Sequence, residues 1–469
     1  MAMDYLILLK QEWMITLILF VLLFLKLGKD VPNATLLPWI NGLLCLNLIS
    51  GFFFNKEGIL FGEMFVTHAR LVMEKNILNL ALLLISMQAY NWLLTHKHLI
   101  EFYLLLLTAI LGMFFMISSG HLLMFYLGLE MSTIPVAAAV NFDLTRKQSS
   151  EAAMKMIISS AFSSCLLLLG ISFVYGMSGT LQFSELARHL STAPLYILSF
   201  VLFFSGLAFK ISAVPFHLWT ADVYEGAPVS VTAFLSVVSK ASVLFVLVSV
   251  LYTVFKPLAD IWYQILYLLS MLTILTGNLF AIRQNNLKRF LAFSSIAQVG
   301  FILIGLSAGT QAGMTSVIYF LLIYVFSNLA AFGVVSIIGA VADKHTITDY
   351  KALYRSNPFL TWVLTIALFS LAGVPPTAGF FGKFFLLMAG SAKGNFGLII
   401  FASLNLVISF YYYLRIVKAM FMDPNENPIQ TIQVSWLPKL ALIICLAGIL
   451  ITGLANDVYS YIFSLCSGL

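Results

Sequence analysis

The chain is divided almost from end to end into apolar runs, each long enough to cross a lipid bilayer. A membrane-spanning helix needs about 20 apolar residues, and the sequence contains fourteen such runs. They lie at 10–28, 34–53, 72–95, 99–118, 120–141, 151–176, 193–215, 229–254, 260–282, 287–308, 312–341, 358–389, 396–420 and 435–463. Only 9% of the residues are charged, whereas a soluble domain carries about 25%. We therefore predict an all-α polytopic membrane protein with about fourteen transmembrane helices.

Two of these runs contain prolines at similar places. Val214-Pro215 ends the run 193–215, and Val374-Pro375-Pro376 lies in the middle of 358–389, so both helices should be broken there. Five spans fit between equivalent points, and an odd number of helices per repeat inverts the second copy in the membrane. The pattern predicts two inverted five-helix repeats with broken helices, an arrangement typical of transporters. For either break alone, a proline kink that serves only packing is the alternative.

This repeat divides the chain into four predicted regions. They are a three-helix region at 1–96, a first repeat at 97–257, a second repeat at 258–423 and a C-terminal helix at 424–469. The first apolar run has the length of a full span and no small-residue cleavage site after it, so we expect it to stay as a helix.

Basic residues set the expected orientation. Loops that follow odd-numbered spans hold 13 of the 25 lysines and arginines, and the N-terminus with the loops that follow even-numbered spans holds 7. Because basic loops stay in the cytoplasm, we expect the odd loops there and both termini on the periplasmic face. The formal net charge of +6 comes from single cations between apolar runs, not from a basic patch, which argues against nucleic-acid binding.

The sequence contains no recognisable cofactor motif. The four cysteines are far apart, with no CxxC pair and no metal-ligand spacing. Neither a disulfide framework nor an iron–sulfur centre is predicted, and no glycine-rich dinucleotide motif is present.

We single out six ionisable residues inside apolar runs, where a charge at the bilayer centre costs about 2.5–3.5 kcal/mol on insertion scales. They are Glu130, Lys155, Lys210, Lys240, Lys383 and Arg415. A desolvated lysine can lose its proton whereas arginine cannot, so a row of buried lysines favours proton transfer. A metal-ion path would show clustered carboxylates instead.

Each of these residues also has a purely structural interpretation. Glu130, Lys210, Lys240 and Lys383 can serve as ion-pair partners that only hold helices together. Lys155 lies near the start of its span and can extend to the membrane surface. For Arg415, near a span end, we favour the structural role. His217, directly after the first break, is as consistent with a helix-end histidine as with a proton carrier.

Several segments resemble the antiporter-like membrane subunits of respiratory complex I. The segment 209–219 reads FKISAVPFHLW and leads into DVYEGAP at 222–228. The wording VYEGAP is similar to that of the N-type subunits. Further matching segments are EAAMK at 151–155, SSIAQVG at 294–300 and GVPPTAGF at 373–380, so the resemblance covers roughly residues 70–420.

The resemblance implies roles for individual residues. Glu130 matches a glutamate that pairs with the lysine at the position of Lys210, and Lys240 and Lys383 match lysines that continue the proton path. Lys155 matches a lysine that modulates it. The family fold has fourteen helices with two inverted five-helix repeats. The chain departs from the family pattern at Ala221, Ser239 and Gln298, where a proline, a proline and a histidine are common, and the last change puts a proton role for that position in doubt.

The same resemblance implies partners and a location. We expect a bacterial inner membrane, contacts with the M-type antiporter-like subunit and the small K-, J- and A-type subunits, and NAD, FMN, iron–sulfur clusters and quinone on partner subunits only. The chain would move protons in an NADH:quinone oxidoreductase while the redox chemistry occurs elsewhere. Two alternatives stay open: an Mrp-type cation/proton antiporter subunit, and a scaffold subunit that does not pump.

Overall fold

The computed structural model of the chain describes residues 2–28, 31–53 and 56–467. The N-terminal part consists of three long helices, two short helices and a small hairpin. Its elements are α1 (Ala2–Leu8), α2 (Lys10–Leu27), α3 (Asn33–Ser50), β1 (Gly58–Leu60), β2 (Phe65–Thr67), α4 (Ala69–Gln88) and α5 (Tyr90–Leu94). The two strands pair antiparallel, with Ile59 opposite Val66. This hairpin is the one departure from the predicted all-α fold within the described residues.

The central part of the chain contains five long helical segments, two of them irregular. In order they are α6 (Leu99–Ile117), α7 (Leu122–Val140), α8 (Lys147–Ser178), the short α9 (Phe183–His189), α10 (Pro194–Ile211), α11 (Leu218–Gly226), α12 (Val229–Phe234), the π-helix η1 (Leu235–Ser239) and α13 (Lys240–Tyr252). The segments α12, η1 and α13 form one continuous span over Val229–Tyr252.

The remaining chain adds a similar series of helices and then a C-terminal pair. The elements are the 3-10 turn η2 (Lys256–Leu258), α14 (Ala259–Ile282), α15 (Leu287–Ser307), α16 (Gln311–Ala342), the short α17 (Leu353–Ser356), α18 (Pro358–Ala372), α19 (Ala378–Ser391), α20 (Phe396–Phe421), α21 (Trp436–Leu454) and α22 (Asn456–Leu465). The span predicted at 435–463 is therefore divided between α21 and α22.

Within the described residues, 11 helices are long and apolar enough to cross a membrane. The predicted class, an all-helical polytopic membrane protein, is confirmed. The helices α2 and α3 are also apolar but do not meet the same criteria, and the predicted span 358–389 consists of two shorter apolar helices, α18 and α19.

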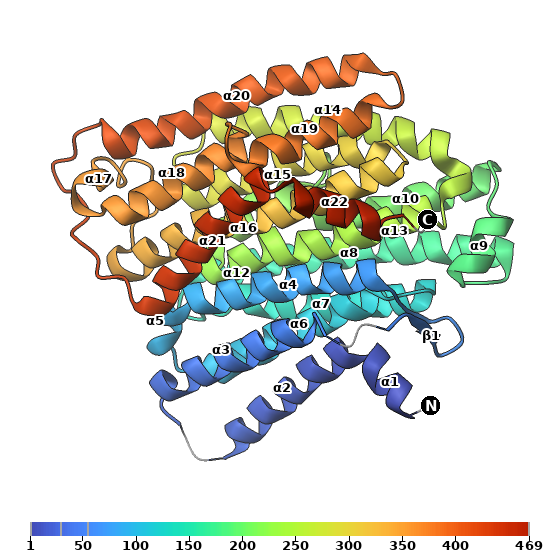
Figure 1. Cartoon of the computed structure of the whole chain (residues 1–469), viewed down its shortest axis with the longest axis horizontal. Helices are drawn as coiled ribbons and strands as arrows, with labels where there is room; N and C mark the ends of the chain where they lie inside the picture. Colours follow the sequence, from blue (N-terminus) through green and yellow to red (C-terminus); the bar gives the residue numbers. More distant parts are fainter. Residues whose placement is uncertain (1, 29–30, 54–55, 468–469) are drawn as a thin grey trace.

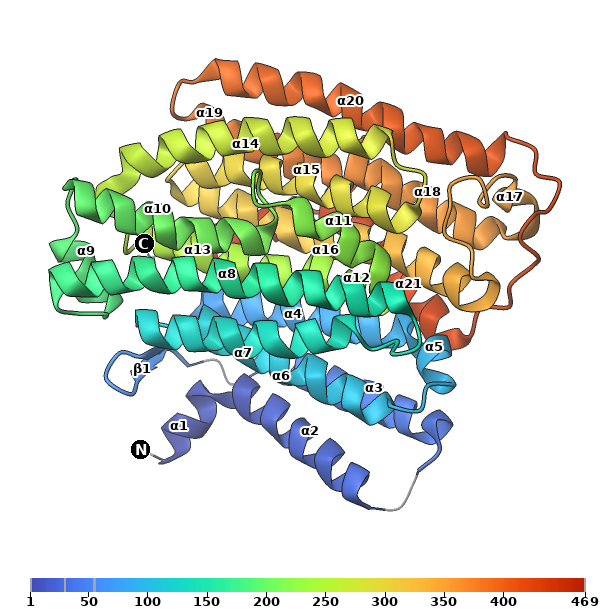
Figure 2. The ribbon, with the colours of Figure 1, turned by 180° about the vertical axis from the view of Figure 1, so that it is seen from behind.

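The long helices run side by side, with α2 and α20 at opposite edges of the molecule (Figures 1 and 2). The hairpin and α9 lie at one end of the bundle, and α5 and α17 lie at the other (Figure 1). Almost all residues of α15 and α16 are buried, whereas fewer than half of those of α8, α14 and α20 are. Exposed apolar faces at the edges and buried polar residues inside are expected of a bundle in lipid.

Both predicted breaks are present, and the two helices that precede them end with the same cap. In the first break Ser212 has φ +64°; its N–H donates to the carbonyl of Phe209, and the next N–H, of Ala213, donates to Ala208. In the second break Gly373 has φ +87°, with equivalent bonds from Gly373 to Ser370 and from Val374 to Phe369. This bond pattern is a Schellman cap, which ends a helix at a left-handed residue.

The caps correct the predicted register of the two breaks by one residue. The caps place Ser212 at the position equivalent to Gly373, so Pro215 is equivalent to Pro376. Aligning the two Val-Pro pairs, Val214-Pro215 with Val374-Pro375, would instead make Pro215 equivalent to Pro375. The reason is that the position of the left-handed residue, not of the first proline, decides where each helix ends.

Candidate functional site

Lys210 is the last lysine before the first break, in the final turn of α10. Its side chain is buried, and its ammonium donates to the hydroxyls of Thr133 on α7 at 2.8 Å and Ser160 on α8 at 2.7 Å. Each hydroxyl accepts a charge-assisted bond, which is stronger than a bond between neutral groups. The protonated form of Lys210 is therefore solvated by hydroxyls on two neighbouring helices.

Glu130 lies one turn from Thr133 on α7 and accepts a hydrogen bond of 2.5 Å from Ser164. Among the described residues, no ion pair joins Glu130 directly to Lys210. The carboxylate is close enough to act electrostatically on the ammonium. Ser164 and Ser160 are one turn apart on α8, so hydroxyls of the same helix bind the carboxylate of Glu130 and the ammonium of Lys210.

Lys240 occupies the junction of η1 and α13. Its ammonium donates to Ser295 of α15 at 2.8 Å and lies 5.4 Å from the centre of the Tyr224 ring, and only 2% of the side chain is exposed. A π-helical turn such as η1 is uncommon and is found frequently at functional sites. Here it directly precedes the buried lysine.

Lys383, in α19, contacts the end of the helix before the second break. Its ammonium donates to the carbonyls of Leu371 at 2.7 Å and Ala372 at 3.4 Å, and the Phe301 ring lies 4.9 Å away. The Schellman cap leaves these two carbonyls without helical partners, and the C-terminal end of a helix carries partial negative charge. The broken helix therefore provides the acceptors for this cation.

Gln298 links the surroundings of the last two lysines. Its amide donates to the carbonyl of Leu371 at 3.0 Å, the same oxygen that accepts from Lys383, and to the hydroxyl of Tyr413 at 3.2 Å. Gln298 lies one turn from Ser295, the partner of Lys240, on the buried helix α15. Two polar side chains of α15, one turn apart, thus lie beside Lys240 and beside the carbonyl that Lys383 binds.

Within the described residues, no hydrogen bond connects the Lys210 group to the Lys240 group. Proton transfer between them requires water, which can bridge polar groups in a protein interior. The arrangement as a whole offers three buried amines, one carboxylate and several hydroxyls, which can accept and pass protons.

Lys155 lies apart from this arrangement. It forms ion pairs with Glu151 at 2.7 Å and Asp222 at 2.8 Å, and its side chain is 44% exposed. Arg289 joins Asp222 at 2.8 Å and Glu225 at 2.7 Å, and together these residues line a cavity of about 190 Å³. Lys155 is therefore an exposed member of an ion-pair cluster and is not buried among the relay residues.

The two remaining residues singled out from the sequence lie near helix ends. His217 immediately precedes α11, is buried, and its Nδ1 has no hydrogen-bond partner among the described residues. Arg415 donates to the carbonyl of Ile282 at 2.6 Å and to that of Gln284, at the end of α14. This contact agrees with the structural role that we favoured for Arg415, because arginine stabilises helix C-terminal carbonyls.

Comparisons with known proteins identify the family. The family model described as "NADH:quinone oxidoreductase/Mrp antiporter, TM" matches residues 119–409, a segment that contains every relay candidate from Glu130 to Lys383. The chain is 46% identical to NADH-quinone oxidoreductase subunit N of Phocaeicola vulgatus over 452 residues, which cover 94% of each protein. This chain belongs to the subunit N family of NADH-quinone oxidoreductases.

Solved structures agree with the family assignment. A chain of respiratory complex I from Thermus thermophilus, solved with bound aureothin, superimposes with a TM-score of 0.81 at 30% identity, covering 95% of this chain and 98% of that one. A chain of the Mrp complex from Dietzia superimposes with a TM-score of 0.86 at 17% identity over 99% of this chain and 97% of that one. The second likeness establishes the shared fold alone.

The structure adds Lys288 to the buried cations of this family member. The 13 cations counted from the sequence in loops after odd-numbered spans include Lys288, but it lies in the first turn of α15, where its ammonium donates to the carbonyl of Ala227 at 3.1 Å. The local sequence offered a clue, since Asn286 caps this helix by accepting from the N–H of Lys288 at 2.8 Å. A cation in a first turn is unfavourable with the helix dipole and so needs another partner.

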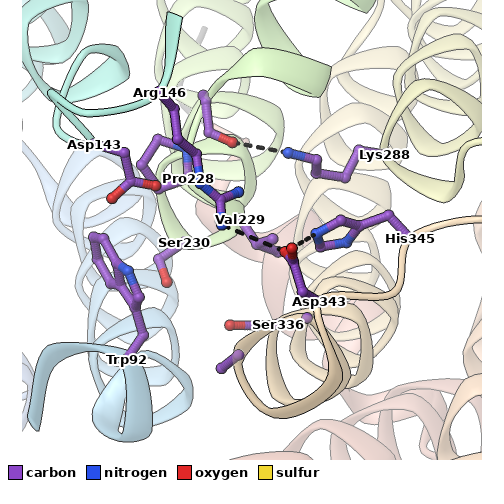
Figure 3. Close-up of a pocket in the computed structure, with 13 residues that line it drawn as sticks. Trp92, Asp143, Arg146, Pro228, Val229, Ser230, Lys288, Ser336, Asp343 and His345 are labelled. Atoms are coloured by element: carbon purple, nitrogen blue, oxygen red, sulfur yellow. Dashed lines mark hydrogen bonds and ion pairs between the residues drawn. The ribbon is translucent and has the colours of Figure 1, made fainter. Parts of the chain in front are cut away.

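Lys288 faces a cavity of about 200 Å³, which Arg146, Asp343 and His345 also line (Figure 3). Arg146 pairs there with Asp343 at 3.4 Å, and His345 lies 3.6 Å from the same carboxylate. Burial, with the nearby cation of Lys288, lowers the pKa of His345 below its usual 6.5, although Asp343 opposes the shift. His345 is therefore neutral at pH 7 and can accept a proton.

Arg70 and Lys75 are among the 7 cations counted from the sequence in the N-terminus and the loops after even-numbered spans, and this assignment is wrong. Both side chains are buried in the first two turns of α4, together with the fully buried Glu74. The span was expected to begin at residue 72, but the helix begins at Ala69. Composition alone cannot separate a buried charged turn from a solvated loop at the end of a span.

Proposed function

We propose that this chain translocates protons as membrane subunit N of an NADH:quinone oxidoreductase, with redox chemistry on other subunits driving the transfer. Family membership supports the assignment. The observation that carries the relay is the placement of Ser295, which binds Lys240, one turn from Gln298, which binds the carbonyl oxygen shared with Lys383. Such a placement on a buried helix has no evident use in packing against lipid.

The proposed mechanism begins at Glu130 and Lys210, each of which is bound by hydroxyls of neighbouring helices. The carboxylate stabilises the protonated amine through the hydroxyls of α7 and α8. A movement of α8 transmitted from a neighbouring subunit separates the two groups, the ammonium loses its stabilisation, and its proton passes through water to Lys240. Lys383 receives it next, and return of α8 allows Lys210 to reload from the cytoplasmic side.

Lys155 and His217 take secondary roles in this proposal. Lys155 modulates the first step through Asp222, which lies on α11 directly beyond the first break. The free Nδ1 of His217 offers a proton acceptor on the same side of that break. Neither residue contacts Lys210 in the described structure, so each acts through the position of α11 or through water.

We further infer the architecture that the resemblance implied: fourteen spans and two inverted five-helix repeats. The helices α2 and α3 and the broken pair α18 and α19 supply the three spans beyond the 11 long apolar helices. Matched Schellman caps support the repeat, as do the equal lengths of α8 and α16, which have 32 residues each. The proposed boundaries stay at 1–96, 97–257, 258–423 and 424–469.

The proposed setting is a bacterial inner membrane, with both termini on the periplasmic side. The proposed neighbours are the M-type subunit and the K-, J- and A-type subunits. NAD, FMN, iron–sulfur clusters and quinone are assigned to partner subunits. Among the described residues, no group of three or more His, Cys, Asp or Glu side chains could hold a metal ion.

Replacing Lys210 with alanine tests the relay. In membrane vesicles that contain the assembled complex, Lys210→Ala should strongly reduce NADH-driven proton translocation, because the first amine of the relay is lost. Lys393→Ala is the control, since this lysine lies between α19 and α20, near the ring of Tyr263 and away from the relay. Undiminished translocation by the assembled Lys210→Ala complex would refute the relay. Undiminished translocation after Lys155, Lys210, Lys240 and Lys383 are all neutralised would favour the scaffold alternative.

The Mrp-type alternative is distinguished by its ion requirement. The shared fold favours it as a second candidate, although the identity of 17% is far below the 46% to the subunit N relative. A cation/proton antiporter should exchange Na⁺ or K⁺ for protons in vesicles without NADH. Absence of such exchange, with NADH-driven pumping present, supports the complex I assignment.

A further inference from the structure

Four charged side chains are buried near the start of α4, away from the line of lysines. Glu12 of α2 and Arg70, Glu74 and Lys75 of α4 are each less than 5% exposed. They lie toward the end of the bundle that carries the β1–β2 hairpin (Figure 1). The four form two pairs of different quality.

The pair between α2 and α4 is the closer one, although the second carboxylate oxygen of Glu12 has no hydrogen-bond partner. The ammonium of Lys75 lies 2.5 Å from a carboxylate oxygen of Glu12, and the rings of Phe65 and Phe114 lie 5.0 and 5.7 Å from it. A close pair that is also covered by aromatic rings is a stable way to bury two charges. Its role is to hold α2 against α4.

The pair within α4 is incomplete. Arg70 Nε lies 3.6 Å from Glu74 Oε1, beyond hydrogen-bond distance. The two other nitrogens of Arg70 are directed elsewhere, one to Ser249 at 3.0 Å and one to Met314. Both oxygens of Glu74 lack a hydrogen-bond partner, although the side chain is 0% exposed.

An ionised carboxylate without hydrogen bonds is costly inside a protein, and such a group takes up a proton instead. Arg70 is the nearest cation, and its pairing with Glu74 is too loose to hold the charged form alone. Glu74 can therefore exist in either protonation state, provided that a proton can reach it.

Arg70 lines a cavity of about 390 Å³ that provides such access. Hydroxyls of Ser119, Ser249 and Thr253 also line it, and Ile59 of the hairpin, which is 57% exposed, lies at its edge. A cavity of this volume with several polar groups can hold water. Water at Arg70 is one side chain away from Glu74.

The charged and titratable groups around this site come from several elements. They are Lys10 and Glu12 on α2, Glu57 before β1, Glu63 on the hairpin turn, His68 before α4, Arg70 and Lys75 on α4, and Cys466 after α22. Burial and the charge of Arg70 lower the pKa of His68 from 6.5 to about 4, so His68 is neutral at pH 7. Arg70 is then the cation that faces both the cavity and Glu74.

We propose that Glu74, positioned by Arg70, is a proton-exchange site that communicates with the face of the membrane at the β1–β2 hairpin. The carboxylate binds one proton delivered by water in the cavity and returns it to the same water. The site is separate from Glu130, Lys210, Lys240 and Lys383 and does not depend on their roles. Because Arg70 also holds Ser249 of α13, the helix that begins at Lys240, the charge of Glu74 acts on the far end of that helix.

Infrared spectroscopy of the purified complex tests the proton site. The difference between the unmodified complex and Glu74→Gln should contain the stretching band of a protonated carboxyl group without hydrogen bonds, and this band should be lost as pH rises. Glu63→Gln is the matched control, since Glu63 lines the same cavity but accepts a bond from Ser184 and should not give the band. If no such band appears, or if it does not change over the full pH range, the proposal is overturned.

If the complex with Glu74→Gln does not assemble, a second variant tests the same site. Glu74→Asp keeps the carboxyl group but withdraws it by one methylene, which changes its distance to Arg70, so the band should titrate at a different pH. An unchanged titration in the assembled Glu74→Asp complex contradicts a proton site at this position.

Side-specific labelling tests the access route. With Thr253→Cys, a small charged thiol reagent should label this chain from the hairpin side and not from the opposite side. The unmodified chain gives the background of its four cysteines, and Ser242→Cys, at a buried position of the same helix, is the control. Labelling of Thr253→Cys no greater than these controls, or labelling from the opposite side, overturns the proposed route.

Discussion

Gly379 sits where the two halves of the second break meet, and its replacement by alanine gives a quantitative test of the site geometry. A Cβ atom at Gly379 would lie 1.7 Å from the carbonyl oxygen of Ser370, whereas real Cβ atoms essentially never approach closer than 3.0 Å. Helices α18 and α19 must therefore separate by about 1.3 Å at this contact. The obstacle is backbone, so no side-chain rotation relieves it.

This displacement reaches Lys383 because both residues are on α19, one turn apart. If the same shift is passed to the ammonium, its 2.7 Å bond to Leu371 lengthens to about 4.0 Å, beyond hydrogen-bond distance. A hydrogen bond to a charged group contributes about 1.5–3 kcal/mol, and a misplacement of about 1 Å at a functional site can lower a rate about 100-fold. We expect Gly379→Ala to reduce proton translocation by between about 10-fold and 100-fold.

The assay is NADH-driven proton uptake in vesicles, normalised to the amount of assembled complex. Gly176→Ala is the control, because a Cβ atom there meets nothing within 4 Å and the residue lies inside α8. This control should assemble and pump normally, since alanine favours a helix more than glycine does. Normal pumping by assembled Gly379→Ala would refute the claim that Lys383 depends on the geometry of the break.

Three further predictions concern residues around the relay. Arg415→Ala should destabilise the chain by about 2 kcal/mol, because the last carbonyls of α14 lose a charged donor; thermal unfolding measures this, and an unchanged unfolding temperature contradicts it. Lys155→Ala should leave thermal stability unchanged, since exposed ion pairs contribute little, so a large loss would show that the cluster around Asp222 holds the fold. His68→Gln should reduce the fall in the free energy of unfolding between about pH 6.5 and pH 4, because the folded state holds His68 neutral whereas the unfolded state binds the proton. An identical fall in the variant and the unmodified protein would exclude His68 as a cause.

The sequence predicts the membrane class and both helix breaks, because long apolar runs and prolines have direct physical consequences. It also predicts that Lys210, Lys240 and Lys383 are buried, since each lies well inside an apolar run. Lys155 is harder to place, because near a helix end a long side chain can reach either the interior or the surface. The structure puts it in the exposed ion-pair cluster.

Other features of the site depend on three-dimensional contacts that local sequence does not encode. The hydroxyls that bind Lys210 come from α7 and α8, and only the packing of these helices brings Thr133 and Ser160 to the ammonium. The sequence does not single out Glu74, because it is close to the start of its span, where the sequence cannot distinguish a buried charged residue from one in a solvated loop. The one-residue shift between the breaks required the backbone angle of Ser212, a residue type that seldom adopts a left-handed conformation.

Ser295 and Gln298 lie three positions apart on α15, so the same helix makes the contact to Lys240 and the contact to the Leu371 carbonyl oxygen that Lys383 also binds. Successive residues of an α-helix are separated by about 100° around its axis. A rotation of α15 about its axis by even half this angle would move both side chains away from their partners at the same time. The bonds of Lys383 to the end of α18 do not involve α15, so this rotation would detach Lys240 from Ser295 and Gln298 from Leu371 at the same time, while Lys383 keeps its own carbonyl partners.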